Sequence, residues 1–303
     1  MRLSDLLVLG LLLVAGSTRA AGVAEGTPYV LEGAQAYTLR APALGRDYEI
    51  DVSLPPSYGQ GDRRYPVVFV TDSPYAFPLT QAIEGRISRH SKALPEFILV
   101  GLGYAKGETG EYSRRRDYTP TSGGDPDAVS DMLGRPVRFG EAEGYRRFVA
   151  EQVFPFIAAH FRADMSRKVF AGHSYGSLFG AWVMCTAPEM FDGYVLGSPS
   201  LWFDDHAVLA RERAYAAAHR DLRARVYVGA GELEGRAPPG HARDPRYSKD
   251  VDMVADAQAF SRTLAARRYP GLRLRTDVIA GENHLSVAPA LITRGLLWTL
   301  GNQ

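Results

Sequence analysis

The sequence contains little of what marks a disulfide-rich, nucleic-acid-binding or metal-binding protein. Cys185 is the single cysteine, so the chain cannot form a disulfide with itself. It lies in an apolar stretch and is expected to be a buried small hydrophobe. The formal net charge is only +1, which gives no reason to expect nucleic acid as a partner. No H-E-x-x-H motif, Cys/His cluster or P-loop is present, so neither a metal nor a cofactor is expected.

Apolar runs long enough to cross a membrane are also missing. The apolar run of residues 6–15 is too short, since a membrane-spanning helix needs roughly 20 residues. It follows the positive charge of Arg2 and precedes small residues up to Ala20, which is the pattern of a secretory signal peptide. We predict removal of residues 1–20, export to the periplasm or the cell exterior, and no membrane span.

The remainder has the pattern of a mostly parallel α/β protein. Residues of about 27–54 alternate in polarity and predict two antiparallel strands with one wet face. Short continuous apolar runs predict strands buried on both faces of a parallel sheet; they are residues 66–71, 97–100, 169–171, 194–196 and 225–228. Apolar residues at steps of three and four predict helices over residues 145–161 and 254–264. We expect one domain, residues 21–303, with helices on both faces of the sheet.

Two long segments interrupt this alternation. Residues 105–140 are rich in Gly, Pro, Asp and Arg, and residues 235–249 form a second irregular stretch. Structureless loops of this length are usually functional. Both follow predicted strands, so both are expected at the carboxyl edge of the sheet, where open α/β sheets bind ligands.

A G-x-S-x-G motif spans Gly172 to Gly176 and makes Ser174 a candidate nucleophile. The motif alone is weak, but an apolar strand runs into it and a helical pattern follows it. Strand, sharp turn and helix form the nucleophile elbow of the α/β-hydrolase fold. In this turn the serine faces the substrate and the helix N-terminus adds a positive field.

The general base of such a site is a histidine, because imidazole both accepts and returns a proton near neutral pH. The chain order of the fold is serine, acid, histidine. His284 follows the last predicted strand and precedes a C-terminal helix, which is the expected position. His206 and His219 lie in a polar helical stretch, and His241 lies in the second loop. His173 is expected to point away from the nucleophile.

The acid that orients the histidine is expected just after the strand 225–228. Glu234 is favoured, with Glu232 as the alternative and with Asp250 or Asp252 further along; a dyad without an acid is also open.

Stabilisation of an oxyanion needs two backbone N–H groups. Tyr175, directly after the nucleophile, supplies one. The second is expected from the turn after residues 70–71, where Pro74 has no N–H and the donor is Ser73 or Tyr75.

These segments together resemble the esterase branch that includes the periplasmic and cytoplasmic enterobactin (siderophore) esterases. The resemblance rests on residues 65–74, 116–120, 172–176, 198–202, 231–234 and 281–284, in the family's order. It implies an α/β-hydrolase fold and ester hydrolysis, with Ser174 as nucleophile, His284 as base and Glu234 as acid. Relatives often have Gly after the Asp of the first segment, where this chain has Ser73, which leaves the second oxyanion donor open.

The first long loop carries a run of arginines. Arg114 and Arg116 are candidate ligands for an anionic substrate, because guanidinium groups suit anionic oxygens and stack on aromatic rings. Trp202 and Tyr118 are candidate stacking surfaces. The alternative is that Arg116 and Asp117 pin the loop through ion pairs.

The sequence therefore predicts a cofactor-independent serine esterase acting through an acyl-enzyme. The leading substrate is an enterobactin-type siderophore trilactone, with or without iron. The alternatives are a broader carboxylesterase or thioesterase for small acyl esters, and a binding module that has lost the chemistry.

Overall fold

A computed structural model of the protein describes residues 26–240 and 244–301. The predicted signal peptide and His241 lie outside the described residues. Residues 26–32 contain no helix or strand. The main elements in chain order are β1 (Ala34–Ala41), β2 (Arg46–Ser53), β3 (Tyr65–Thr71), α1 (Ser73–His90), β4 (Ile98–Ala105), α2 (Gly110–Asp117), α3 (Ala142–Phe148), α4 (Phe154–His160), β5 (Ala163–His173), α5 (Tyr175–Met184), β6 (Gly193–Gly197), α6 (Phe203–Ala218), β7 (Ala224–Gly231), α7 (Met253–Ala266), β8 (Leu272–Ile279) and α8 (Ala288–Thr299).

The strands form one sheet in the order β1-β2-β4-β3-β5-β6-β7-β8. β1 and β2 pair antiparallel, and β2 pairs antiparallel with β4. All pairings from β4 to β8 are parallel. The prediction of two antiparallel strands followed by a parallel sheet is therefore confirmed.

The burial of each strand follows its place in the sheet. Every residue of β3 and β6 is buried, because helices cover both faces of these central strands. The edge strands β1 and β8 instead mix exposed and half-buried positions, and only the last residue of each is buried.

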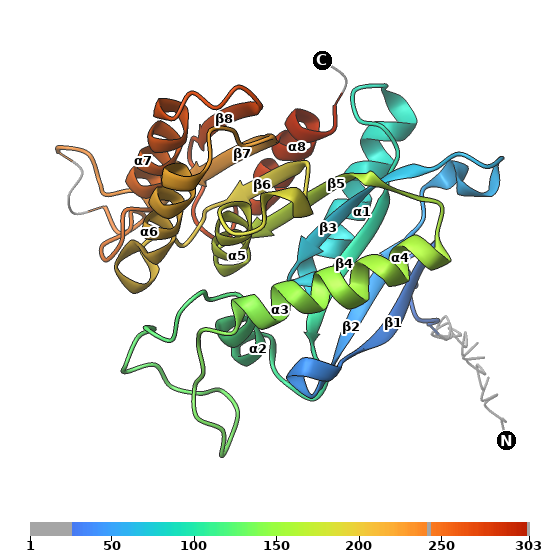
Figure 1. The fold of residues 1–303 in the computed structure, drawn as a ribbon, viewed down its shortest axis with the longest axis horizontal. Helices are drawn as coiled ribbons and strands as arrows, with labels where there is room; N and C mark the ends of the chain where they lie inside the picture. Colours follow the sequence, from blue (N-terminus) through green and yellow to red (C-terminus); the bar gives the residue numbers. More distant parts are fainter. Residues whose placement is uncertain (1–25, 241–243, 302–303) are drawn as a thin grey trace, which may run out of the picture. The chain divides into compact units, whose positions relative to one another are not determined.

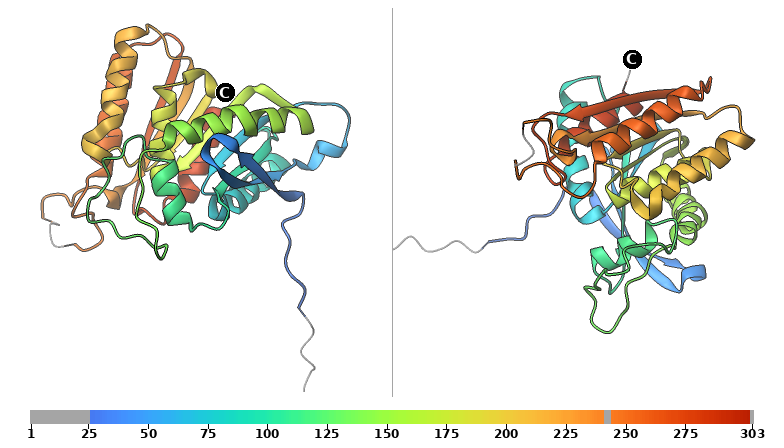
Figure 2. Two further views of the ribbon diagram at one scale, coloured as in Figure 1. Left: turned by 60° about the horizontal axis from the view of Figure 1, so that its bottom comes forward. Right: turned by 90° about the vertical axis from the view of Figure 1, so that its left-hand side faces the viewer.

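Helices cover both faces of the sheet (Figures 1 and 2). On one face α1 and α8 contact each other, with α8 against β6 and β7. On the other face α4 and α5 pack on β5, and α5 contacts α6. α6 is tied to α7 by the ion pair between Arg267 and Glu212. This is the α/β-hydrolase architecture that the sequence predicts.

Both long segments begin at the carboxyl ends of strands, β4 and β7, as expected. The first is not wholly irregular, because it contains α2. Thr109 is the N-cap of this helix, and its side chain accepts a hydrogen bond from the N–H of Tyr112 (3.2 Å). α2 is therefore a defined support for the arginines of this segment.

Candidate active site

Ser174 lies in a sharp turn between β5 and α5. Its backbone has φ 58° and ψ −122°, a left-handed conformation that is strained for any residue with a side chain. The glycines on either side are required by close packing. A Cβ on Gly172 would lie 2.5 Å from the carbonyl carbon of Gly176, and one on Gly176 would lie 2.2 Å from Oγ1 of Thr71. The motif thus has the geometry of a nucleophile elbow.

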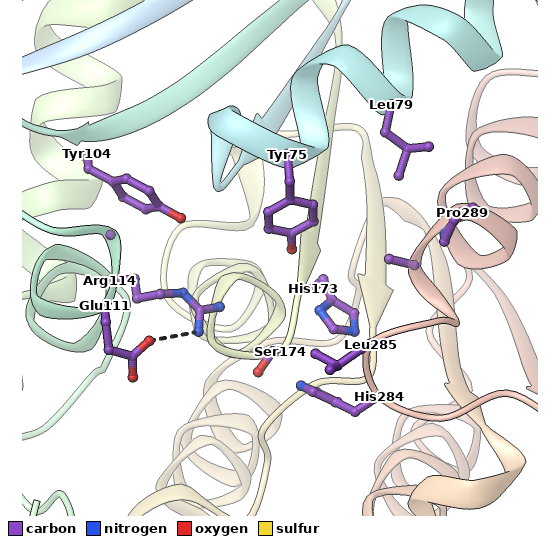
Figure 3. Close-up of a pocket in the computed structure, with 12 residues that line it drawn as sticks. Tyr75, Leu79, Tyr104, Glu111, Arg114, His173, Ser174, His284, Leu285 and Pro289 are labelled. Atoms are coloured by element: carbon purple, nitrogen blue, oxygen red, sulfur yellow. Dashed lines mark ion pairs between the residues drawn. The ribbon is translucent and has the colours of Figure 1, made fainter.

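His284 comes from the loop between β8 and α8, and its ring points toward Ser174 (Figure 3). Its Nδ1 lies 2.6 Å from Oε2 of Glu234. A carboxylate only accepts hydrogen bonds, so Nδ1 is the protonated nitrogen. The unprotonated Nε2 is then free to accept a proton from a serine.

Glu234 lies at the end of a short 3-10 turn, Glu232–Glu234, directly after β7. Its side chain is buried, and Oε1 accepts hydrogen bonds from Oγ of Ser198 and from the N–H of Gly231, each at 2.6 Å. Burial acts to raise the pKa of Glu234, but the hydrogen bonds from His284, Ser198 and Gly231 outweigh it and hold the pKa below its ordinary value. Glu234 is therefore a carboxylate near neutral pH.

The other acids considered lie elsewhere. Glu232 is exposed and accepts the N–H of Gly281 (2.9 Å). Asp252 accepts the N–H of Ala255 at the start of α7, and Asp250 is exposed. Of the four candidates, only Glu234 has a hydrogen bond to His284 in the described part of the chain.

The expectation that His173 points away from the site is wrong. Its ring lines the pocket and packs on the ring of His284, with 4.5 Å between centroids (Figure 3). The alternation of side chains along β5 does not predict the direction of His173, because His173 is the last residue of the strand and the sharp turn begins directly after it. Burial, followed by the proximity of His284, lowers the pKa of His173 to about 3, so this imidazole is neutral.

His206 and His219 lie away from the pocket, as expected. His206 contacts Asp256 through Nε2 (3.1 Å), and the ring of His219 stacks on Tyr215. Cys185 is buried, as predicted, and burial raises the pKa of its thiol to about 12.

Two serines that sequence reasoning did not single out support the site. Ser198 has a positive φ of 43° and donates its hydroxyl to Glu234. Oγ of Ser200 lies 3.3 Å from Oγ of Ser174. Both lie in the segment 198–202, one of the segments that carry the resemblance to the siderophore esterases.

The candidate oxyanion donors begin two helices. Tyr175 is the first residue of α5 and Ser73 is the first residue of α1. The first N–H groups of a helix have no acceptor within it, so neither of these N–H groups has a partner in its own helix. The N–H of Tyr75 instead donates to the carbonyl of Asp72 (3.2 Å), which leaves Ser73 as the better candidate of the two.

A pocket of about 690 Å³ opens beside Ser174. One side is apolar, with Leu79 from α1 and with Leu285, Ala288 and Pro289 from the last loop and α8 (Figure 3). The opposite side is polar. It is lined by Tyr104, Glu111 and Arg114.

Arg114 is fixed at the polar side of the pocket by a buried carboxylate. Its Nε and Nη2 donate to the two oxygens of Asp72, at 3.0 and 3.4 Å. Tyr104 also donates to Asp72 (2.8 Å), and the guanidinium lies 5.4 Å from the ring centroid of Tyr175. Burial acts to lower the pKa of Arg114, but Asp72 outweighs it and raises the pKa above its ordinary value. Arg114 is therefore a charged group in the same pocket as Ser174.

Arg116 does not reach the pocket, which corrects its assignment as a substrate ligand. It is 2% exposed, with Nε 2.9 Å from Asp117 and Nη1 2.8 Å from Glu108. On α2 the side chain of Arg116 points into the protein interior. Its ion pairs fit the alternative interpretation, in which Arg116 and Asp117 hold the loop in place.

Neither of the two aromatic candidates is among the residues that line the pocket. Trp202 does not line the pocket and packs against the rings of Tyr175 and Phe203. Tyr118 is fully buried, and its hydroxyl accepts the N–H of Asp72 (3.4 Å). Tyr118 therefore offers no stacking surface to a ligand, while Trp202 is half-buried and lies outside this pocket.

Within residues 26–240 and 244–301, no group of three or more His, Cys, Asp or Glu side chains is arranged to hold a metal ion. No helix of this described part is both long enough and apolar enough to cross a membrane.

Comparison with protein families finds a match over residues 41–244, more than half of the chain. The matching model is that of the Esterase family, described as "Putative esterase".

Two curated proteins are similar over most of their length. Ferri-bacillibactin esterase BesA of Bacillus subtilis is 29% identical over 90% of this chain and 91% of its own. A siderophore triacetylfusarinine C esterase of Aspergillus fumigatus is 26% identical over 89% of this chain and 94% of its own.

Solved structures share the fold. The BES protein of Bacillus cereus superposes with a TM-score of 0.75 at 25% identity, covering 92% of this chain and all of the other. The siderophore hydrolase EstA of Aspergillus nidulans gives a TM-score of 0.71 at 21% identity, over 90% of this chain and 97% of the other.

Proposed function

This chain belongs to the Esterase family, and from that premise we propose that it is a serine esterase cleaving the ester bonds of an enterobactin-type siderophore trilactone, free or ferric. That it is an ester hydrolase follows from the family and from relatives named as esterases over most of their length. We propose in addition which residues catalyse the reaction and which ester is cleaved.

The mechanism is acyl transfer in two steps. His284 takes the proton of Ser174 through Nε2 while Oγ attacks the ester carbonyl. The N–H groups of Tyr175 and Ser73 stabilise the oxyanion. His284 then gives its proton to the leaving alcohol, and a water activated by the same imidazole releases the acid. Glu234 holds the Nδ1–H tautomer and stabilises the imidazolium.

One observation carries the catalytic assignment: a buried carboxylate 2.6 Å from Nδ1 of a histidine whose ring faces a serine in a strained elbow. An ion pair that served stability alone would not need the serine to adopt a positive φ. Strain of this kind concentrates at functional sites.

The substrate assignment rests on the relatives and on the pocket. Both curated relatives are named for siderophore ester hydrolysis. A ferric catecholate siderophore is anionic and aromatic, and Arg114 presents a fixed guanidinium beside Ser174. Arg114 is therefore proposed as the anion-binding residue.

A second candidate function is a broader carboxylesterase or thioesterase for small acyl esters. The apolar side of the pocket, with Leu79, Leu285, Ala288 and Pro289, favours it because it suits an alkyl or aryl group without charge.

A hydrolysis panel separates the two functions. Enterobactin, ferric enterobactin and nitrophenyl esters are compared by kcat/KM, with Ser174→Ala as the blank. A trilactone hydrolysed with a higher kcat/KM than the nitrophenyl esters supports the proposal. Rapid cleavage of nitrophenyl esters without any hydrolysis of the trilactones would refute the siderophore assignment and favour the carboxylesterase function.

We further propose that residues 1–20 are a signal peptide and that residues 21–303 form one catalytic domain in the periplasm or outside the cell. Arg2 and the apolar run 6–15 support removal of the leader. Mass spectrometry of the exported protein is expected to find a mature chain beginning near Ala21. An exported protein that retains Met1 would refute the cleavage.

A further inference from the structure

Arg114 lies between two carboxylates that differ in burial. Asp72, from the turn before α1, is fully buried and holds Nε and Nη2. Glu111, one turn earlier on α2, approaches the remaining nitrogen, with its Oε2 3.9 Å from Nη1. Figure 3 shows Glu111 beside the guanidinium on the pocket wall. The one nitrogen of Arg114 that Asp72 leaves unoccupied is thus faced by a second carboxylate.

The charges of this wall cancel. Glu111 also pairs with Arg115, whose Nε lies 2.8 Å from Oε1. Asp72 and Glu111 therefore balance Arg114 and Arg115. Glu111 weakens the attraction of Arg114 for an anion most directly, because a carboxylate beside Nη1 repels any anion that approaches the same nitrogen.

Only one of the two carboxylates is able to withdraw. Asp72 is 0% exposed and has no other cation among its hydrogen-bond partners in the described chain, so leaving Arg114 would strand a buried charge. The side chain of Glu111 is 42% exposed and already has its shorter contact with Arg115. Glu111 can turn to Arg115 alone and leave Nη1 of Arg114 to a ligand.

We propose that Glu111 is a specificity-determining residue: it occupies the anion position of Arg114 in the empty enzyme, and an anionic ester displaces it while a neutral ester does not. This rests on the proposed role of Arg114. Glu111 therefore lowers the affinity for anionic esters, and its removal is expected to improve their hydrolysis. An increase in kcat/KM on substitution is unusual, since most substitutions in a pocket weaken binding.

The test compares two substrates that share the acetyl ester to be cleaved and differ in the charge of the para group, para-acetoxybenzoate and its neutral methyl ester. The quantity measured is the ratio of kcat/KM for the anionic ester to kcat/KM for the neutral one. Effects on the common chemistry cancel in this ratio. Glu111→Gln is expected to raise it about twofold to fivefold, the range of a partly exposed charge pair. The rise is expected to shrink at high salt.

The chain offers a matched control in α3. Glu143 lies in the first turn of its helix and pairs with arginines three and four residues later, Arg146 at 2.7 Å and Arg147 at 2.9 Å. Its side chain is 44% exposed, and it does not line the pocket. Glu143→Gln therefore removes an equivalent pair of helix contacts and is expected to leave the ratio unchanged.

Arg114→Gln separates failure of this inference from failure of the proposed function. An unchanged ratio in Arg114→Gln would refute the anion site itself. A ratio that falls in Arg114→Gln but does not rise in Glu111→Gln would overturn the role of Glu111 alone. An equal rise in Glu143→Gln would show a general charge effect and would also overturn it.

Discussion

Replacing Glu234 by glutamine is expected to remove most of the activity without unfolding the protein. Oε1 accepts two hydrogen bonds, from Ser198 and from the N–H of Gly231. The amide oxygen of glutamine must take that position, which turns the amide NH2 toward Nδ1 of His284. An NH2 group donates, so Nδ1 becomes the acceptor and the proton moves to Nε2. Nε2 of His284 then has no lone pair with which to accept the proton of Ser174.

The expected loss follows from this wrong tautomer. It corresponds to a fall in kcat of about 10³- to 10⁴-fold, by the size of such an effect in serine hydrolases, or ~4 to 5.5 kcal/mol in the barrier. KM is expected to change little, because Glu234 does not line the pocket. The assay is steady-state hydrolysis of a neutral nitrophenyl ester, with circular dichroism to confirm folding.

Glu232→Gln is the matched control two residues earlier. The side chain of Glu232 is exposed, and its one hydrogen bond within the described residues is accepted from the N–H of Gly281. A change of kcat within about threefold is therefore expected, the scale of surface substitutions. A Glu234→Gln enzyme that keeps more than a tenth of its kcat would refute the tautomer argument. A larger loss of kcat in Glu232→Gln than in Glu234→Gln would indicate that Glu232 is the acid that orients His284.

Two further predictions concern buried charges. Arg116→Ala removes a cation from two buried carboxylates: Asp117 keeps Arg46 at 3.8 Å, and Glu108 keeps Arg135 at 3.1 Å. A stability loss of up to about 3 to 5 kcal/mol is expected, with equal losses of activity on charged and neutral esters, and an unchanged melting temperature would contradict this. Glu84 is buried in α1, and burial raises its pKa to about 7 from 4.5, so the folded state keeps a proton that the unfolded state releases. Stability is then expected to fall as pH rises from about 4.5 to 7, and Glu84→Gln is expected to raise the melting temperature at pH 8 more than at pH 5. An equal shift at both pH values would contradict the raised pKa.

The sequence specifies the fold and the order of the site because both depend on patterns along the chain. Continuous apolar runs predict β3 to β7, and the elbow predicts where a strand must end and a helix begin. Ser174, Glu234 and His284 each follow a strand, and the carboxyl ends of parallel strands meet at one edge. Their proximity therefore follows from topology alone.

Side-chain direction does not follow from such patterns. Arg114 and Arg116 are two residues apart on α2, so they point to different sides, and only tertiary packing decides which one meets the pocket. His173 meets His284 because the elbow breaks the alternation of the strand. Signals for α2 were present, with Thr109 as N-cap and Glu111 in the first turn, but the many glycines and prolines around them concealed the helix.

The most direct test of the account is covalent labelling of the nucleophile. The purified enzyme is treated with a fluorophosphonate and digested, and the modified peptide is sequenced by mass spectrometry. We expect one adduct, on Ser174, with loss of ester hydrolysis in proportion to labelling and no adduct in Ser174→Ala. An adduct on Ser200 or another serine, or full hydrolysis after Ser174 is labelled, would contradict the account.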